Sequence, residues 1–367
     1  MSGCRGRTAV AAAALSLAVC LAACGGSGES GPGGADSGEG GFAVGLLFSQ
    51  DIQTRWETFD KPLIERKVKE LCAGCVLEYA NAQGDVAAQK QQVETLLSKD
   101  IEVLILSAIN FRSLRSSVER AHDAGVPVIA YDGLVEGPIS AHVSFDNERV
   151  GRLQGEALLK AMGDRTDGGQ IVMMNGPQTS PTNVAFKTGA MSALRGKVAI
   201  GRSYDVPGWS QEIAHADMVR AIAALGTDGI DGVYAANDGL AAGVISALRA
   251  ARIEPLPPVT GQDADLEAVQ RILLGEQYMS VYKPFKAEAD TAAEMAVALG
   301  RGENIDTVAE TSVDTATTKD IPAVLLDPVP VTVDDIKDTV IKDGVYTTDQ
   351  ICTPRVRAAC ERAGLVG

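Results

Sequence analysis

"DVAAQKQQVETLLSKDIEVLILSA" (residues 85–108) joins two hydrophobic patterns that have different periods. In the first part, apolar residues recur at helical intervals from Val86 to Leu97, which predicts a helix over residues 85–100. The second part, residues 101–108, is a continuous apolar run of strand length, which is typical of a strand buried on both faces. A helix that leads directly into such a strand is the repeating unit of parallel α/β proteins.

The same alternation of strands and helices extends in both directions from this stretch. Residues 42–48 and 75–80 have strand character and flank a helical segment at 57–71, and the alternation continues to residue 302, with a strand and its turn predicted at 258–265. About ten strands is long for one open sheet, so we expect two smaller parallel sheets with a cleft between them. The predicted fold class is α/β with two Rossmann-like lobes, whose ligands bind beyond the carboxyl ends of the strands.

The start of the chain has the pattern of an export signal. Arg5 and Arg7 precede an apolar run of small residues that ends at Ala23 and is short for a bilayer span. The next residue, Cys24, completes "LAAC", which resembles the lipobox of bacterial lipoproteins, and residues 25–41 hold no large apolar side chain. We expect a cleaved signal peptide, a lipidated Cys24 and a flexible tether. The alternative is an ordinary signal peptide in which the cysteine is incidental.

Composition narrows the class of protein. The 367 residues are 46% hydrophobic and 22% charged, which is enough apolar content for a well-packed core. The formal net charge is -15 at pH 7. Because the phosphates of nucleic acid repel an acidic surface, we expect no nucleic-acid partner.

Four cysteines remain once Cys4, Cys20 and Cys24 are assigned to the signal and the anchor. In an oxidising compartment they predict two local disulfides, Cys72–Cys75 and Cys352–Cys360. The spacing of Cys72 and Cys75 also equals half a zinc site, but no second pair or histidine cluster accompanies it, so we expect no metal. Redox activity is a further alternative for this pair, although a thioredoxin-like setting is absent from the pattern.

Polar and aromatic residues follow the predicted strands. They are Arg55, Trp56, Asp132, Asn147, Trp209, Asn237, Asp238, Gln262, Asp263 and Lys283. Carboxylates and amides pair with neighbouring hydroxyls, cations donate to ring oxygens, and indole faces cover the C–H surface of a sugar ring. The set therefore predicts a polyhydroxylated ligand. Alternatively, Asn237 and Asp263 cap helices, the tryptophans pack internally, and Arg55 is a surface residue.

No catalytic motif competes with this interpretation. The sequence contains neither a G-x-S-x-G elbow nor a G-x-x-x-x-G-K-[ST] phosphate loop. Its three histidines, His122, His142 and His215, have no evident nucleophile partner. A pair of carboxylates could serve a glycosidase, but the sequence does not give their separation. We expect a binding protein without a cofactor and not an enzyme.

Five segments resemble the periplasmic D-xylose-binding proteins, which belong to the ribose/galactose-type sugar receptors of ABC importers. They are "AYDG" (130–133), "HVSFDNERVG" (142–151), "AANDGLAAG" (235–243), "TGQDADLEAVQRILLGEQYMSVYKP" (260–284) and "DTVIKDGVY" (338–346). The resemblance spans about residues 42–346. It implies the type I periplasmic binding protein fold, with three crossovers near 144–147, 282–284 and 322–328.

The resemblance also implies domain limits. They are a signal peptide (1–23), Cys24 with the tether (24–41), an N-terminal lobe (42–145 plus 284–322), a C-terminal lobe (146–283 plus 323–348) and an extension (349–367). The site residues that carry over are Arg55, Trp56, Asp132, Trp209, Asn237, Asp263 and Lys283.

Two positions depart from the family pattern. The family has a sugar-binding arginine where this chain has Gly133, and its asparagine pair falls on Pro181 and Thr182. Asn183 lies one position further on and is the predicted substitute. Loss of a bidentate cation lowers affinity or changes which hydroxyls are recognised, so D-xylose is the favoured ligand and another sugar is the alternative.

The resemblance implies a monomeric receptor on the outer face of the cell membrane that delivers a monosaccharide to ABC permease subunits. A sensory or chemotaxis partner is the first alternative for the same fold. A sugar-responsive repressor is disfavoured by the export signal and by the lack of a basic helix-turn-helix at the start. A secreted carbohydrate enzyme is the remaining alternative.

Overall fold

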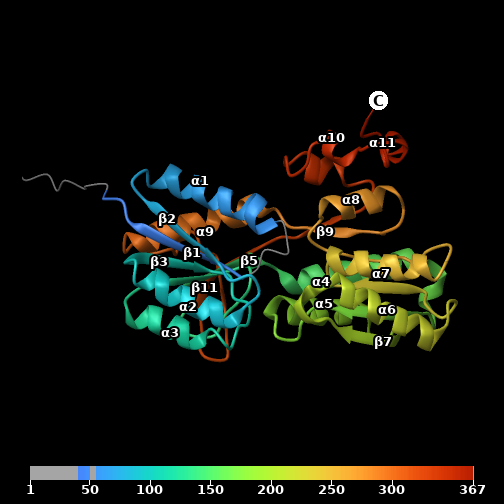
Figure 1. Cartoon of the computed structure of the whole chain (residues 1–367), viewed down its shortest axis with the longest axis horizontal. Coiled ribbons are helices and arrows are strands. Elements are labelled where there is room, and N and C mark those ends of the chain that lie inside the picture. Colours follow the sequence, from blue (N-terminus) through green and yellow to red (C-terminus); the bar gives the residue numbers. More distant parts are fainter. Residues whose placement is uncertain (1–39, 50–54, 367) are drawn as a thin grey trace, which may run out of the picture. The chain divides into compact units, whose positions relative to one another are not determined.

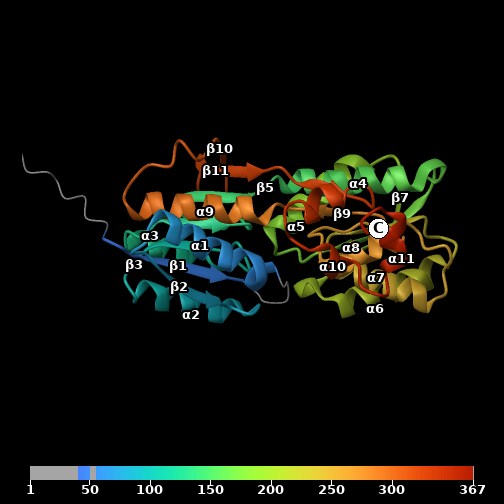
Figure 2. The ribbon, with the colours of Figure 1, turned by 90° about the horizontal axis from the view of Figure 1, so that it is seen from above.

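The computed structural model describes residues 40–49 and 55–366, which form one compact unit. The predicted signal peptide, the lipidation site Cys24 and almost all of the predicted tether lie outside the described residues. None of the described helices has both the length and the apolar character needed to cross a membrane. Figures 1 and 2 show that the unit contains two lobes, each built around its own sheet.

The first lobe is built on a seven-stranded sheet with the order β10-β11-β5-β4-β3-β1-β2. The strands are β1 (Ala43–Phe48), β2 (Val76–Asn81), β3 (Ile101–Leu106), β4 (Val128–Tyr131), β5 (Ala141–Phe145), β10 (Thr311–Val313) and β11 (Ile321–Leu326). All neighbouring pairs are parallel except β10 and β11. The prediction of a parallel sheet is therefore confirmed for this lobe.

Helices cover both faces of this sheet, as the continuous apolar strands predict. In Figure 1, α1 (Lys61–Leu71) and α9 (Phe285–Gly300) lie on one side, while α2 (Val86–Leu97) and α3 (Arg115–Asp123) lie on the other. Side chains of β3 alternate between the two cores: Val103 faces the α1 side and Leu104 faces the α2 side. A short π-helix, η1 (Trp56–Asp60), leads directly into α1.

The second lobe has a three-stranded parallel sheet with the order β7-β6-β8. Its strands are β6 (Gln170–Asn175), β7 (Ala199–Asp205) and β8 (Gly232–Ala235). Its helices are α4 (Asn147–Met162), η2 (Gly163–Thr166), α5 (Pro181–Leu194), η3 (Pro207–Trp209), α6 (Gln211–Leu225), α7 (Asp238–Ala250) and α8 (Leu266–Leu273). A separate antiparallel pair joins β9 (Ser280–Tyr282) to β12 (Val329–Val331).

Two sequence-based boundaries are wrong. Of the strand with its turn predicted at 258–265, the strand is reduced to an isolated bridge between Val259 and Val233, because the turn begins sooner than the apolar pattern indicates. The transfer to the second lobe predicted at residue 323 comes later, because β11 pairs with β5 as far as Leu326 opposite Phe145. The remaining limits of the predicted domains stay predictions.

The end of the chain folds onto the second lobe. It forms η4 (Lys337–Ile341), α10 (Thr348–Ile351) and α11 (Arg357–Arg362), which lie above α8 in Figure 1. Ile351 and Val356 pack with Val269 of α8 in one apolar cluster. A disulfide joins Cys352 to Cys360 beside this cluster, and a second disulfide joins Cys72 to Cys75 after α1. Both pairings predicted from the sequence thus occur in the structure.

Candidate functional site

A cavity of about 230 Å³ lies where loops of the two lobes meet. Its walls come from segments that follow β1, β3 and β4 in the first lobe and β6, β7 and β9 in the second, so they lie at the carboxyl ends of strands. Six residues predicted from the sequence line it: Trp56, Asp132, Trp209, Gln262, Asp263 and Lys283. Strand ends that are far apart in the sequence are therefore brought together in one place.

Arg55 lies beside this cavity and is held by acidic partners. Its Nε and Nη2 each donate to the Asp60 carboxylate at 3.0 Å, and Nη2 also donates to Glu288 Oε2 at 2.5 Å. The hydroxyl of Tyr131 donates to Asp60 as well. We call Arg55, Asp60, Tyr131 and Glu288 the Arg55 cluster. All four side chains are buried, so this cluster is a closed network of charges within the first lobe.

The guanidinium of Arg55 is also fixed between two aromatic rings. Its Cζ lies 4.5 Å from the centre of the Trp56 ring and 4.6 Å from that of Phe285. The remaining nitrogen, Nη1, lies 3.6 Å from Asp132 Oδ1. The prediction that Arg55 belongs to the site fits this orientation, although its side chain does not line the cavity wall.

The electrostatics of the Arg55 cluster follow from burial. Burial raises the pKa of Glu288 well above its ordinary value, and Arg55 only partly opposes this effect. Burial lowers the pKa of Arg55 on its own, but Asp60, Asp132 and Glu288 together raise that pKa well above its usual range. Arg55 is therefore a permanent cation that the surrounding carboxylates keep in place.

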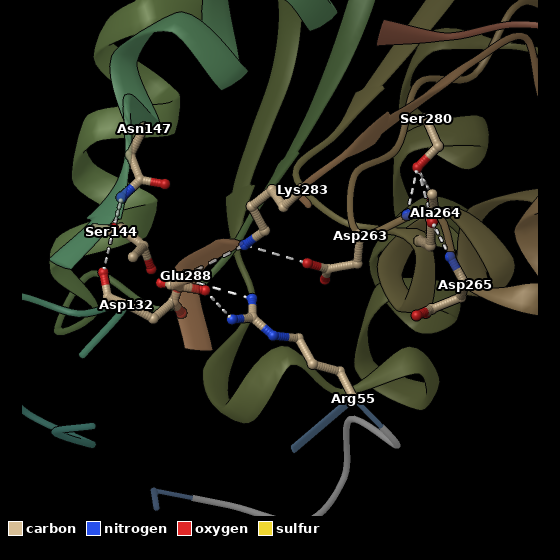
Figure 3. Close-up of polar contacts among 12 residues, drawn as sticks. Arg55, Asp132, Ser144, Asn147, Asp263, Ala264, Asp265, Ser280, Lys283 and Glu288 are labelled. Carbon is tan, nitrogen blue, oxygen red and sulfur yellow. Dashed lines mark hydrogen bonds and ion pairs between the residues drawn. The ribbon is translucent and has the colours of Figure 1, made fainter. Parts of the chain in front are cut away.

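Lys283 connects the charges of the two lobes. Its Nζ lies 3.6 Å from Asp132 Oδ1 and 3.3 Å from Asp263 Oδ1, and Figure 3 shows it between these carboxylates. Burial alone raises the pKa of Asp132, but Lys283 and Arg55 lower it below its ordinary value. Lys283 belongs to the crossover between β9 and α9, so the chain that joins the lobes also carries the central cation.

Several buried polar atoms at the cavity have no hydrogen-bond partner among the described residues. They are Trp56 Nε1, Asp132 Oδ1, Gln262 Oε1 and both carboxylate oxygens of Asp263. Buried polar groups are nearly always hydrogen-bonded, and leaving one unpaired costs about 1–3 kcal/mol. Four of these five atoms are acceptors, so the site suits a ligand that supplies several hydrogen-bond donors.

Three residues of the site have backbone angles that non-glycine residues rarely adopt. The φ angles are 59° at Asp132, 57° at Trp209 and 98° at Asp263. Such conformations cost on the order of 1–3 kcal/mol each and concentrate at functional sites. The three side chains that face the cavity from different loops are thus presented by a strained backbone.

The two predicted asparagines do not line the cavity. Asn183 accepts from Gly176 N at 2.7 Å and donates to Pro177 O at 3.1 Å, so it shapes the loop between β6 and α5. Asn237 caps α7 by accepting from Leu240 N at 2.9 Å. Both interactions are of the capping or loop-forming kind that sequence analysis left open for such residues.

Gly133, the first departure from the family pattern, does line the cavity. A Cβ atom at this position would meet only Ala108 O and Pro181 Cγ, each at 3.8 Å, which is ordinary van der Waals contact. The second departure, Pro181 and Thr182, lines the cavity as well. The two departures therefore face each other across the same part of the site.

Sequence reasoning missed Asp60 and Glu288. Glu288 is fully buried and lies on the face of α9 that also buries Ala292 and Ala296. An acidic residue within an alanine-rich buried stripe was a signal that could have identified it. Asp60 gave no comparable signal, because a π-helix rather than an α-helix sets its position relative to Arg55.

No group of three or more histidine, cysteine, aspartate or glutamate residues suited to a metal ion occurs among residues 40–49 and 55–366. The Asp132, Asp263 and Lys283 arrangement balances carboxylates with a cation, which leaves no need for a metal at that point.

Comparisons with known proteins identify the family of this chain. Residues 44–304 match the family model described as a periplasmic binding protein domain. The D-xylose-binding periplasmic protein of Escherichia coli K12 is 36% identical over 314 residues, which cover 84% of this chain and 92% of that protein. The D-xylose-binding periplasmic protein of Haemophilus influenzae is 35% identical, with 84% of this chain and 91% of that protein covered.

A similar solved structure supports the assignment of the fold. An ABC transporter solute binding protein from Clostridium phytofermentans with bound β-D-glucose matches with a TM-score of 0.78 at 29% identity, covering 84% of this chain and 99% of that one. The predicted two-lobed fold and the resemblance to D-xylose-binding proteins are therefore confirmed. This chain belongs to the periplasmic binding protein family, with the type I fold.

Proposed function

We propose that this chain captures a monosaccharide, with D-xylose as the first candidate, and delivers it to an ABC sugar importer. The family consists of transport receptors, and the chain is accordingly a binding protein and not an enzyme. The similar proteins differ in their sugars: one is named a D-xylose-binding protein, and another has bound β-D-glucose. The sugar specificity of this chain must therefore be inferred from its own site.

The unpaired acceptors of the cavity support this proposal most directly. The Asp263 carboxylate and Gln262 Oε1 are buried and accept no hydrogen bond from the described residues. Adjacent sugar hydroxyls donate to such oxygens in pairs, while the Trp56 indole N–H donates to a hydroxyl or ring oxygen. A pyranose supplies donors and acceptors around its whole rim, which matches this mixed set.

The aromatic residues of the cavity suit the faces of a sugar ring. Trp209 and Phe186 both line the cavity, with ring centres 6.5 Å apart and planes at 66°. Trp56 lies on the opposite lobe. The axial C–H groups of a pyranose are apolar and pack against such rings, so aromatic faces and polar rim together define the ligand class.

A sugar that is bound by both lobes would allow a permease to distinguish loaded receptor from empty receptor. A ligand held by Asp132 in the first lobe and Asp263 in the second bridges them and stabilises the closed arrangement by contacts that the open one lacks. A permease that recognises the closed form would then accept only loaded receptor. This mechanism needs no covalent step and no cofactor.

Calorimetric titration tests the sugar proposal. The chain starting after Cys24 is unfolded and refolded to remove bound sugar, then titrated with D-xylose, L-arabinose, D-ribose, D-glucose and D-galactose. We expect one-to-one binding of D-xylose at micromolar affinity or tighter. A response to a different sugar alone would transfer the specificity to that sugar, and silence for all five would refute the sugar site.

We also propose that the protein is a lipoprotein anchored through Cys24. The apolar segment, the "LAAC" sequence and the following small polar residues support this proposal. A tether of about 17 residues would let the receptor search roughly 20–25 Å around its anchor. The test is mass spectrometry of the protein from the native membrane: a diacylglycerol adduct on Cys24 is expected, and release by Cys24→Ser is the control.

A further inference from the structure

The segment Gly261–Asp265, which we call the 261–265 loop, presents Asp263 to the cavity in an unusual conformation. Two consecutive non-glycine residues have positive φ angles, 98° at Asp263 and 52° at Ala264. Such a conformation persists only where the surroundings impose it. The question is which groups of the second lobe hold this loop in place.

The loop is wrapped around the carboxylate of Asp238, the first residue of α7. Asp265 N donates to Asp238 Oδ2 at 3.0 Å, and Asp238 N donates to Gln262 O at 3.0 Å. The approach is so close that a Cβ on Gly261 would lie 2.0 Å from Asp238 Oδ1. Contacts at both ends of the loop therefore converge on a single buried side chain.

Ser280 and Gln277 complete the network from the other side. Ser280 Oγ lies 3.0 Å and 2.8 Å from the two oxygens of Asp238, and it accepts from Ala264 N at 3.0 Å. Figure 3 shows Ser280 and Ala264 joined in this way. Gln277 Nε2 donates to Asp238 Oδ1 at 2.7 Å. The backbone N–H of Asp265 is thus bound to Asp238 itself, and that of Ala264 is bound to Ser280, which in turn contacts Asp238.

We propose that Asp238 is a positioning residue of the ligand site: its carboxylate holds the 261–265 loop in the strained form that presents Asp263 to the ligand. The inference rests on the proposed function, since the role of Asp263 as a ligand contact is part of it. Asp238 does not line the cavity and acts only through the loop.

The hydrogen bonds explain why a carboxylate is required. One oxygen of Asp238 accepts from the Gln277 amide, and the other accepts from the Asp265 backbone N–H. An asparagine in the same place would direct its own NH₂ at one of these two N–H donors, whichever way it is turned. The isosteric change Asp238→Asn therefore breaks the network at a defined point without changing its shape.

The charged groups around Asp238 come from several elements. Arg271 of α8 donates to Asp238 O at 3.0 Å, and Asp263 and Asp265 approach from the loop. Tyr346 approaches from the segment after η4. Burial raises the pKa of Asp238 to about 7, although Arg271 and the hydrogen bonds oppose it. Measurements at pH 8 therefore compare the ionised residue with its amide.

The experiment measures sugar affinity of Asp238→Asn by calorimetry at pH 8 and 15 °C, with folding checked by circular dichroism. The probe is D-xylose, or D-glucose if only that sugar binds the native protein. Affinity is expected to fall at least tenfold. Asp217→Asn is the matched control, because Asp217 is a buried aspartate of α6 in the same lobe that pairs with Arg220 and does not contact the loop. Its affinity should be unchanged.

A rescue variant separates positioning from a general loss of stability. Asp238→Asn combined with Gln277→Glu puts an acceptor opposite the new NH₂ group while Arg271 keeps its partner on residue 277. The double variant should recover part of the affinity, because Gln277→Glu also removes the amide N–H that donates to Met279 O. Hydrogen exchange of residues 262–265 should be faster in Asp238→Asn and slower again in the double variant, with the rest of the lobe unchanged.

Equal affinities of native protein and a folded Asp238→Asn variant would overturn the inference while leaving the proposed function intact. Failure of the native protein to bind any of the sugars would instead refute the proposed function. If Asp238→Asn does not fold, Ser280→Ala is the second variant, because it removes the acceptor of Ala264 N and a donor to Asp238 together. Unchanged affinity in Ser280→Ala would then overturn the inference.

Discussion

The Arg55 cluster lies beside the cavity in the first lobe, and the 261–265 loop lines it from the second lobe, but the two regions satisfy their polar groups in different ways. In the Arg55 cluster, the guanidinium is bound by Asp60 and Glu288 and lies between two aromatic rings. In the loop, both oxygens of Asp263 have no hydrogen-bond partner among the described residues, and the backbone is strained. The first region binds its guanidinium within the protein, although Glu288 Oε1 has no hydrogen-bond partner among the described residues, whereas the second leaves both oxygens of Asp263 for a ligand.

This contrast predicts that substitutions in the two regions affect different quantities. A change in the Arg55 cluster leaves buried charges without partners and therefore lowers the free energy of unfolding. A change at Asp263 removes acceptors that are left for the ligand, while Lys283 keeps Asp132 as a second partner, and therefore lowers affinity more than stability. The predictions below test this separation.

The largest effect is expected for Arg55→Ala. Removing one partner of a buried ion pair typically costs about 3–5 kcal/mol, because the carboxylates of Asp60 and Glu288 would stay buried without their cation. Urea unfolding of the ligand-free protein measures the loss. Arg66→Ala is the control, since Arg66 is exposed and lies 3.9 Å from Asp290, where a surface pair contributes at most about 1 kcal/mol. Equal losses in the two variants would contradict the prediction.

The second effect concerns pH and the buried His142 of β5. Burial lowers the pKa of His142 to about 4, although a hydrogen bond with Ala130 O opposes this. The unfolded chain takes up a proton near pH 6.5 and the folded chain only near pH 4, so stability is present above pH 6.5 and is lost as the pH falls between these values. The difference amounts to about 3 kcal/mol.

Unfolding titrations at pH 7, 5.5 and 4.5 measure this loss in the native protein and in His142→Asn, which keeps an N–H group but does not ionise. The variant should lose about 2.4 kcal/mol less than the native protein between pH 7 and pH 4.5, since the full difference is reached only below pH 4. His122→Asn, at an exposed position of α3, is the control and should follow the native curve. An identical pH dependence in all three proteins would show that His142 is not the cause.

The third effect tests the loop. Asp263→Asn removes a charged acceptor, and hydrogen bonds to charged groups contribute about 1.5–3 kcal/mol each, so affinity should fall on the order of 10- to 100-fold. Stability of the ligand-free protein should fall less than in Arg55→Ala, because Asp263 accepts no hydrogen bond there and Lys283, its ion-pair partner, keeps Asp132 as a second partner. Asp205→Asn is the control, since Asp205 follows β7 but is bound by Lys187 and Gln178 away from the cavity. A large stability loss without an affinity loss in Asp263→Asn would reverse the contrast.

The sequence predicted residues that line the cavity better than the residues that hold them in place. Trp56, Asp132 and Asp263 follow strands, and the carboxyl ends of parallel strands meet at one edge, so their convergence follows from the fold class. Glu288 lies far along the chain from Arg55 and reaches it only because α9 packs beside α1. Such a contact depends on tertiary packing, which periodicity does not encode.

The local backbone geometry of the site could not be predicted from the sequence either. The strand predicted at 258–265 follows the apolar pattern, but the chain turns into the 261–265 loop because Asp238 and Ser280 bind its backbone N–H groups. Asn237 was predicted as a contact because cap residues and ligand residues occupy the same positions after strands, and Asn183 was predicted as a substitute for the asparagine of the family pattern. Only the observed hydrogen bonds of Leu240 N and Gly176 N distinguish the two roles.

The smallest effect is expected for the two disulfides. Cross-linking residues 8 apart in the Cys352–Cys360 pair stabilises by about 2.5 kcal/mol in the loop-entropy model, and the shorter Cys72–Cys75 pair by about 2 kcal/mol. Replacing either pair by alanine should therefore lower the melting temperature by a few degrees, measured by calorimetry without sugar.

The sugar affinity of the disulfide variants tests whether the C-terminal extension helps to hold the 261–265 loop. Cys352 and Cys360 pack against the side chains of α8, while the 261–265 loop leads directly into that helix. If Asp238 and Ser280 hold the loop by themselves, the variant Cys352→Ala/Cys360→Ala should bind sugar with native affinity despite its lower melting temperature, as should Cys72→Ala/Cys75→Ala. A loss of affinity confined to the C-terminal pair would show that the loop depends on the extension as well as on Asp238.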